Sequence, residues 1–165
     1  MPLTIAIEKL IAWNEDTAEK FHDFIKAQPA IFSLPSDIRS SDETVAGTLQ
    51  HIVYLELRFA NLMAGFSKIP LEGIPKDSIE AIHATHMRAT AIVRQLLADP
   101  TFDWSQELTF EIPNLGPLNA SRETYLIHLT MHSIRHYAQL ATIVRKAGFE
   151  PNSRMDYLFT QARLS

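Results

Sequence analysis

Cysteine is absent from the 165-residue sequence. A disulfide framework, a cysteine-ligated zinc site and a nucleophilic thiol of the protein's own are therefore excluded. The absence fits a reducing compartment, and we expect the protein to be cytoplasmic. Long hydrophobic runs are also missing, because none approaches the roughly 18 residues that a membrane span needs. Acidic residues such as Glu8 and Glu15 interrupt the region where a signal peptide would be apolar, so we expect neither a leader nor a membrane partner.

Charge of one sign is not concentrated anywhere in the sequence. The chain has 15 Lys and Arg against 19 Asp and Glu, a net charge of −4, and the two signs are interleaved. Without a basic cluster we expect no nucleic-acid partner. The hydrophobic fraction of 46% is typical of a globular protein. The length suits one domain over residues 1–165, with a core large enough to fold without a disulfide or a metal.

Four long stretches repeat their apolar residues with the period of an α-helix. We predict helices over residues 4–28, 41–65, 77–97 and 121–147. Thr4 is a candidate N-cap of the first helix, and Gly148 is expected to end the last one. In the third, Asp77 is expected to cap the helix and Glu80 to reach back to it, as in a capping box.

Between the third and fourth predicted helices the period changes to two. Residues 108–112 alternate as a strand, residues 113–117 have the composition of a turn, and Leu118 resumes the alternation. A hairpin this small must pack on the helices to be stable. One more short helix is expected around residues 155–161. The predicted fold class is all-α, a four-helix bundle with a short β-hairpin insert before the last long helix.

Three histidines are predicted to face the interior of this bundle. At about 100° per residue, His132 and His136 both point along the apolar face of the last helix, one turn apart. His51 lies in the apolar face of the second helix. Each could be a hydrogen-bonded core histidine, but burying three unpartnered imidazoles would be costly. A single ion satisfies one nitrogen of each ring, so we predict one divalent metal ion per chain on His51, His132 and His136.

The sequence identifies no catalytic residue, and His86 and His128 are the candidates that it offers. His86 lies on the apolar face of the third helix. It could be a further ligand, a residue that contacts a ligand, or a core histidine, and we favour the last two roles. His128 lies one turn before His132 and about 40° away from it around the helix, where it could contact a ligand or the substrate. No glutamate follows His132, which excludes the His-Glu-x-x-His metalloprotease motif.

Two further pairs, Glu19 with His22 and Glu80 with His83, have the Glu-x-x-His spacing of di-iron proteins. Both glutamates are predicted to point away from the apolar faces of their helices. We therefore interpret Glu19 and Glu80 as surface residues.

The sequence around these histidines resembles the DinB/YfiT-like superfamily. The residues that carry the resemblance are His51 within Leu49–Phe59, the run His132-x-x-x-His136-x-x-Gln139, the Trp13-Asn14 pair, the strand-like insert, Gly148 and the segment Asp156–Leu158. The resemblance covers nearly the whole chain. It implies a four-helix bundle, often a homodimer, with a mononuclear three-histidine site that commonly binds nickel or zinc. Carried over, the ligands are again His51, His132 and His136.

The better-understood members of this superfamily are transferases or isomerases that use low-molecular-weight thiols, and others have been called metal-dependent hydrolases. Tyr137-Ala138 stands where the family often has Arg-Gly, so the subfamily stays open. Because this chain has no cysteine and no obvious acid–base pair, we predict a transferase that activates the thiol of a small-molecule substrate. The alternatives are a hydrolase that uses a metal-bound water and a non-catalytic metal-binding protein.

The last predicted helix is also apolar on the side opposite His132. A helix that is apolar nearly all round must be covered on both sides. The hairpin, the C-terminal segment or a second subunit could cover it, and the family resemblance favours a homodimer. The apolar residues on that side are Leu126, Ile127, Ile134, Ala138, Ala141 and Val144.

Overall fold

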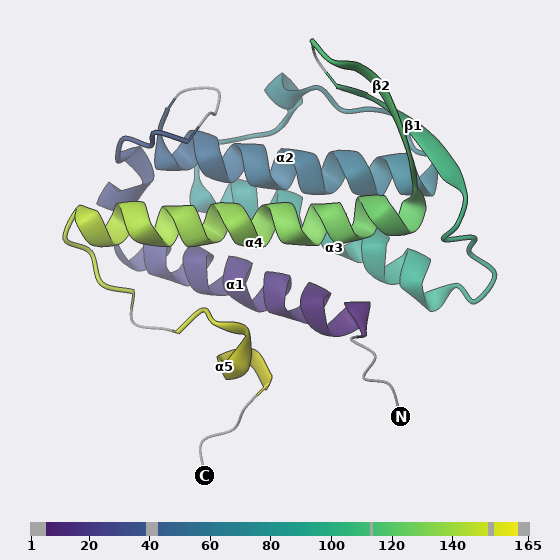
Figure 1. Ribbon diagram of the computed structural model, residues 1–165. Helices are drawn as coiled ribbons and strands as arrows, with labels where there is room; N and C mark the ends of the chain where they lie inside the picture. Colours follow the sequence, from purple (N-terminus) through teal and green to yellow (C-terminus); the bar gives the residue numbers. More distant parts are fainter. Residues whose placement is uncertain (1–5, 39–42, 113, 152–153, 162–165) are drawn as a thin grey trace.

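Four long helices and one β-hairpin make up most of the structure, which is a computed structural model that describes residues 6–38, 43–112, 114–151 and 154–161. The long helices lie side by side, with α2 packed on α3 and α4, and α1 packed on the same two helices (Figure 1). The predicted long helices, the hairpin before the last of them and the short C-terminal helix are confirmed. The elements are α1 (Ile7–Ala27), η1 (Pro29–Ser33), α2 (Val45–Ala64), η2 (Leu71–Gly73), α3 (Ile79–Ala98), β1 (Glu107–Ile112), β2 (Gly116–Ser121), α4 (Arg122–Lys146) and α5 (Tyr157–Gln161).

The space between the long helices is filled by the apolar faces that the sequence pattern predicts. Each helix presents a stripe of Leu, Ile, Val and Phe side chains to its neighbours, and complete burial of one such side chain contributes about 1.5–3 kcal/mol. The largest side chains of this core are almost inaccessible to solvent. They include Phe21 and Ile25 of α1, Leu49, Ile52 and Leu57 of α2, and Leu140 of α4.

The start of α3 differs from the expected capping box. The N-cap is Ser78, whose hydroxyl accepts a hydrogen bond of 3.1 Å from the backbone N–H of Ala81. The predicted cap at Asp77 is therefore wrong by one residue. With Ser78 as the N-cap, Glu80 is the second helical residue, whereas a capping box needs its glutamate at the third. The Glu80 carboxylate instead lies 3.9 Å from the Lys26 ammonium.

The starts of α1 and α2 also lie further along the chain than predicted. Helix α1 begins at Ile7, and its N-cap, Ala6, has no side chain that can cap it, so the predicted cap at Thr4 is wrong; Thr4 itself lies outside the described residues. Helix α2 is capped by the Thr44 hydroxyl, which accepts from the Gly47 N–H at 3.0 Å. The expected start at residues 41–43 was early, and residues 41 and 42 are not described.

Both ends of α4 agree with the sequence. The Ser121 hydroxyl accepts from the backbone N–H of Thr124 at the first turn. Just beyond the last turn, Gly148 has a φ of +88°, a left-handed conformation that a residue with a Cβ adopts only under strain. These two residues fix the length of the helix that carries two of the three predicted metal ligands.

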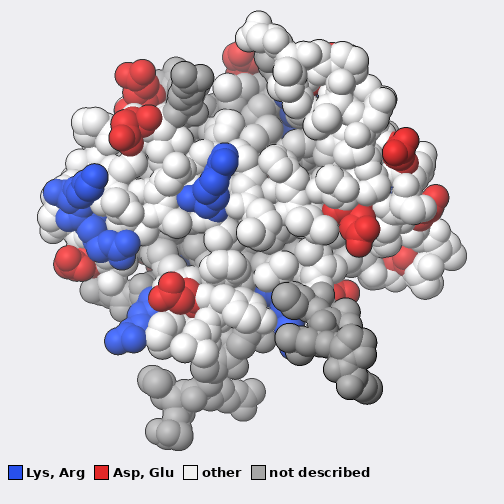
Figure 2. All heavy atoms as spheres, viewed as in Figure 1, with Lys and Arg blue, Asp and Glu red and all other residues white. Residues whose placement is uncertain are grey.

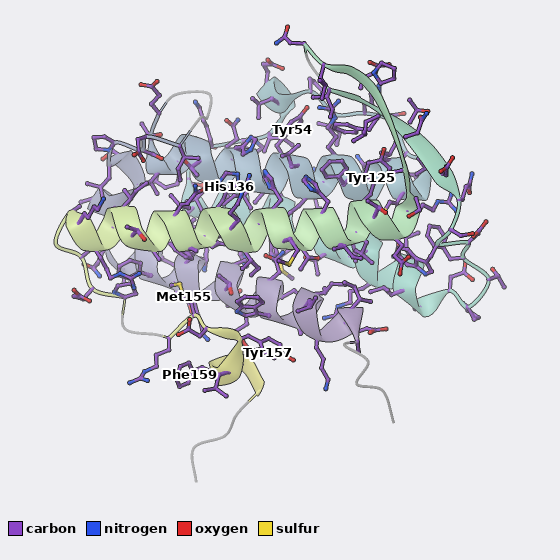
Figure 3. The ribbon with its side chains drawn as sticks, in the orientation of Figure 1. Tyr54, Tyr125, His136, Met155, Tyr157 and Phe159 are labelled. Atoms are coloured by element: carbon purple, nitrogen blue, oxygen red, sulfur yellow. The ribbon has the colours of Figure 1, made fainter. Side chains whose placement is uncertain are left out.

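The hairpin is bonded to the helices at its base. Strands β1 and β2 pair antiparallel, with Glu107 opposite Ser121. The hydroxyl of Tyr125, at the start of α4, lies 3.0 Å from the carbonyl oxygen of Leu108 and 3.1 Å from that of Leu118 (Figure 3). One phenol of α4 thereby bonds to both strands, which satisfies the need of a two-stranded sheet for support.

Aromatic contacts attach the same hairpin to α2. The Phe110 ring of β1 is buried against Phe59, with ring centroids 4.8 Å apart. The Arg58 guanidinium lies 4.2 Å from the centroid of the Phe110 ring and donates a hydrogen bond of 2.9 Å to the Tyr54 hydroxyl. Arg58, a polar residue within the α2 sequence, thus packs between α2 and the hairpin.

No helix in the described part of the chain is long and apolar enough to cross a membrane. The face over α4 and the hairpin nevertheless carries few charged side chains (Figure 2). Two exposed apolar side chains of α4, Ile127 and Met131, are 45% and 52% accessible.

Candidate metal centre

The three predicted ligands come together between α2 and α4. One ring nitrogen from each of His51, His132 and His136 lies within 4.8 Å of the others. The ring centroids of His132 and His136 are 4.4 Å apart, and that of His51 lies 5.1 Å from the first and 5.2 Å from the second. His136 lies on the side of α4 that faces α2 (Figure 3). The predicted inward direction of all three side chains is therefore confirmed.

The protonation of His136 can be deduced from its neighbour one turn along α4. Its Nδ1 lies 2.7 Å from Oε1 of Gln139. Because an amide oxygen can only accept, the proton of the neutral ring must be on Nδ1, with the amide oriented as it is. The Nε2 atom then carries a free lone pair, and it lies 3.1 Å from Nε2 of His132. Gln139 thus directs the basic nitrogen of His136 into the histidine group.

His132 is the most constrained of the three rings. It is 8% exposed, and its Nδ1 is buried without a hydrogen-bond partner among the residues that the structure describes. A neutral imidazole has one donor and one acceptor. Its Nε2 lies 3.1 Å from the bare Nε2 of His136, so this is the nitrogen that faces the group and that a bound ion would use.

All three imidazoles are uncharged at neutral pH. Burial, followed by the neighbouring His136 and Arg135, lowers the pKa of His51 from 6.5 to about 4. Burial, together with His136 and His51, lowers the pKa of His132 to about 3. The pKa of His136 is also lowered, mainly by burial, although the hydrogen bond to Gln139 opposes the change. A neutral imidazole is the form that binds a metal.

The donor set therefore fits a divalent transition-metal ion. Three imidazole nitrogens suit zinc or nickel, and a three-ligand site leaves at least one coordination position for a substrate. The group contains no carboxylate among the described residues, so a bound ion would keep its full positive charge. A buried three-histidine cluster that could bind a metal ion is thus present in the structure.

His128 lies at the edge of this group, as its position on the helix predicts. Its ring centroid is 5.6 Å from that of His132, and its ring meets the Phe59 ring edge-on at 5.4 Å. The side chain is exposed, and its pKa is lowered by partial burial and by Arg135. His128 is therefore a neutral, accessible imidazole next to the three-histidine group.

His86 lies elsewhere, in a separate buried network. Its Nδ1 is 2.7 Å from Oε2 of Glu56, and both side chains are 2% exposed. Oε1 of Glu56 also accepts hydrogen bonds from the Asn14 amide at 2.8 Å and from the Ser133 hydroxyl at 2.7 Å. Each of the four long helices thus contributes one residue to this network, and the interpretation of His86 as a core histidine agrees with it.

Glu56 and Ser133 are two residues of this network that were not predicted from the sequence. The signal for Glu56 was its place in α2, between the apolar residues Val53 and Ala60 at spacings of three and four, which are both buried. A carboxylate on the buried face of a helix requires a partner. Ser133 directly follows His132 in the chain, so Glu56 touches the helix that carries two of the histidines.

Comparison with known proteins gives one finding on the family. The DinB family model matches residues 1–163, a span that includes all four long helices and every histidine discussed above. No curated protein matches the chain.

Proposed function

This chain belongs to the DinB family, and on that premise we propose that it is a metal-dependent transferase whose substrate brings its own thiol. In this proposal His51, His132 and His136 bind one divalent ion, nickel or zinc. The substrate is a small molecule, and the thiol that the metal activates is a low-molecular-weight thiol. The chain forms one domain over residues 1–165, with its long helices arranged as a four-helix bundle. The family match and the geometry of the histidine group support the proposal.

The observation that carries the proposal is the convergence of three neutral imidazoles without a carboxylate. A divalent ion with three neutral ligands would lower the pKa of a bound thiol enough to give a thiolate at neutral pH. The protein's own contribution is orientation, since Gln139 fixes the His136 ring through a hydrogen bond of 2.7 Å. The nucleophile must come from the substrate, because the chain contains no cysteine.

The buried carboxylate of Glu56 also favours a transferase over a hydrolase. A hydrolase commonly uses a carboxylate or a histidine as general base for its water. Glu56 accepts hydrogen bonds from three side chains and is 2% exposed, so it does not reach a substrate. A reaction in which the substrate supplies a thiol depends less on a general base, because the metal itself favours ionisation of the thiol.

The second candidate function is a metal-dependent hydrolase, and His128 is the observation that favours it. This ring is accessible, is neutral at physiological pH and lies 5.6 Å from His132 between ring centroids. It is therefore the residue best placed to accept a proton from an attacking water. The third possibility is a metal-binding protein without turnover.

Cobalt(II)-substituted protein distinguishes these functions. Addition of low-molecular-weight thiols, one at a time, should produce a sulfur-to-cobalt charge-transfer band with the true cosubstrate. His132→Ala protein should lose the cobalt bound at the three-histidine group, and with it the band, while its circular dichroism stays helical. If no thiol gives a band, but ester or amide cleavage depends on metal and is lost in His128→Ala, the protein is a hydrolase. If neither is seen, it is a binding protein.

We also propose that the protein is a homodimer. Part of the predicted apolar side of α4 is covered within the chain itself, because Leu126, Ala141 and Val144 are buried. Ile134 and Ala138 line a pocket of about 470 Å³ between α4, α1 and the segment before α5. The three buried residues are therefore not available to an interface.

The exposed part of that helix, Ile127 and Met131, remains for a second subunit. Leu118 of β2 is likewise 46% exposed on an adjoining element, and this face carries few charges (Figure 2). Light scattering should give a dimer mass, and Met131→Lys should give a monomer. Wild-type protein that is monomeric over a wide concentration range would contradict the proposal.

A further inference from the structure

A second histidine cluster lies between α1 and α3, on a different pair of helices from the three-histidine group. The rings of His22 in α1 and His83 in α3 are stacked, with centroids 4.4 Å apart and an angle of 29° between their planes. Oε2 of Glu19, one turn before His22, lies 2.9 Å from Nε2 of His83. Two imidazoles and a carboxylate from two helices therefore meet at one place.

The His83 nitrogen in this cluster has no satisfactory hydrogen-bond partner. Its Nε2 atom is buried, and although the Glu19 oxygen is near enough for an ion pair, no described residue offers it a hydrogen bond of acceptable geometry. The other ring is better satisfied, because Nδ1 of His22 lies 3.0 Å from Oδ1 of Asp23. An unsatisfied buried nitrogen beside a carboxylate is the arrangement that a bound cation would complete.

The charges at the cluster also suit a cation. The pKa of His83 is lowered, mainly by burial and also by the neighbouring His22 and His86, although the adjacent Glu19 opposes the change. The ring is therefore available as a neutral ligand next to a negative carboxylate. The two rings also line a mostly apolar pocket of only about 10 Å³, which is too small for an organic ligand.

The Glu-x-x-His spacing occurs in both α1 and α3, but only the glutamate of α1 contacts the histidine cluster. The Glu19 side chain is 56% exposed, in agreement with its interpretation as a surface residue, yet it reaches across to His83. Glu80 has the same Glu-x-x-His spacing ahead of His83 but faces Lys26 at 3.9 Å. Only one of the two glutamates can contribute to a site.

We propose that His22, His83 and Glu19 form an accessory binding site for a divalent transition-metal ion such as Zn²⁺, which links α1 to α3. Two imidazoles and one carboxylate are a common donor set for zinc. The ligand atoms of Glu19, His22 and Asp23 lie within 4.8 Å of one another, and His83, which is outside that group, adjoins it through its Nε2 atom, 2.9 Å from Oε2 of Glu19. The site does not depend on the proposed function, because it shares no residue with the three-histidine group.

The test is zinc binding by His132→Ala/His136→Ala protein, which lacks two of the three residues of the other group. Competition with a metallochromic indicator should find one Zn²⁺ per chain. Adding His83→Ala to this protein, or separately His22→Ala, should abolish the zinc binding. Two separate substitutions are used so that one variant that fails to fold does not decide the result. Glu19→Gln should weaken binding about tenfold or more, whereas Glu80→Gln, the matched control, should leave it unchanged.

Two outcomes overturn the accessory site. One is that folded His132→Ala/His136→Ala protein binds no zinc. The other is that its zinc survives both His22→Ala and His83→Ala, which would show adventitious surface binding. If wild-type protein instead binds a single Zn²⁺ that depends on His83 and not on His132, the accessory site stands and the three-histidine proposal fails.

Discussion

Nδ1 of His86 and Oε2 of Glu56 lie 2.7 Å apart in the interior of the protein. Burial alone would raise the pKa of Glu56 and lower that of His86. Their mutual attraction reverses both effects, so that the pKa of Glu56 is lowered and that of His86 is raised. Each group therefore favours the charged form of the other, as in an ion pair. Such a pair adds little net stability over apolar residues, but the loss of one partner leaves the other charge buried and unpaired.

We predict that Glu56→Ala destabilises the protein by about 3–5 kcal/mol. The substitution removes the acceptor of His86, Asn14 and Ser133 at once. Urea denaturation of metal-free protein, followed by circular dichroism, measures the change. Glu80→Ala, at an exposed position of α3, is the control and should change the free energy of unfolding by no more than about 0.5 kcal/mol. A loss below about 1 kcal/mol for Glu56→Ala would mean that the network is not intact in solution.

The same pair gives a pH dependence of stability. Because the folded pKa of Glu56 is below its ordinary 4.5, its contribution is present above pH 4.5 and is lost as the pH falls through the folded pKa. Because the folded pKa of His86 is above 6.5, its contribution is present below pH 6.5 and is lost as the pH rises through the folded pKa. The stability difference between wild type and Glu56→Gln should therefore be largest between pH 4.5 and 6.5. Denaturation at a series of pH values that shows a constant difference would refute this.

The three-histidine group could be predicted from the sequence because helical periodicity determines where each side chain points. His132 and His136 share a face through their spacing alone, and His51 lies among the apolar residues of α2. The direction of a side chain depends only on local spacing. The predictions that used this information, the long helices and the inward histidines, are confirmed.

The contacts between helices could not be predicted in the same way. Whether Glu56 meets His86, or Glu19 meets His83, depends on the relative rotation and axial shift of two helices. Those quantities follow from how all the core side chains pack together, and sequence spacing within one helix does not contain them. The periodicity of α2 could have shown that Glu56 is buried, but not that it meets His86. In the same way, Glu19 could be placed at the surface but not beside His83.

The cap of α3 shows a local limit of the same kind. Asp77 and Ser78 are both good N-cap residues and are adjacent, so propensity alone does not choose between them. In the structure the Ser78 hydroxyl accepts from Ala81, and Asp77 is exposed. We predict that Ser78→Ala lowers the free energy of unfolding by about 1 kcal/mol, whereas Asp77→Ala has a smaller effect. Thermal denaturation of the two variants in parallel measures this, and the reverse order would restore the original assignment.

Gln139 gives a prediction for the metal centre that does not remove a ligand. Its amide oxygen fixes the proton of His136 on Nδ1. Gln139→Ala should therefore weaken metal binding by about 10–100-fold while the protein stays folded. Gln95→Ala, at an exposed glutamine of α3, is the control. Affinities from competition with a chelator measure both, and equal affinities for the two variants would show that Gln139 does not orient the ring.

The lowered pKa values of the histidine group predict how its metal affinity varies with pH. A proton competes with a metal for each ring, so an ordinary site of histidines loses affinity below pH 6.5, by roughly tenfold per pH unit and ring. Here the pKa is about 4 for His51 and about 3 for His132, and that of His136 is also lowered.

Zinc affinity should therefore decline far less than for an ordinary site as the pH falls below 6.5, and should be lost steeply only near pH 4. The stability of the metal-free protein responds over a different range, because between pH 6.5 and about 4 the unfolded chain binds protons that the folded rings of His51 and His132 do not. The metal-free protein should lose stability as the pH falls through that range. Chelator competition and denaturation over the same pH series test the two effects. A steep loss of zinc affinity immediately below pH 6.5 would show that the rings are protonated as easily as in water, and that they are not packed as described.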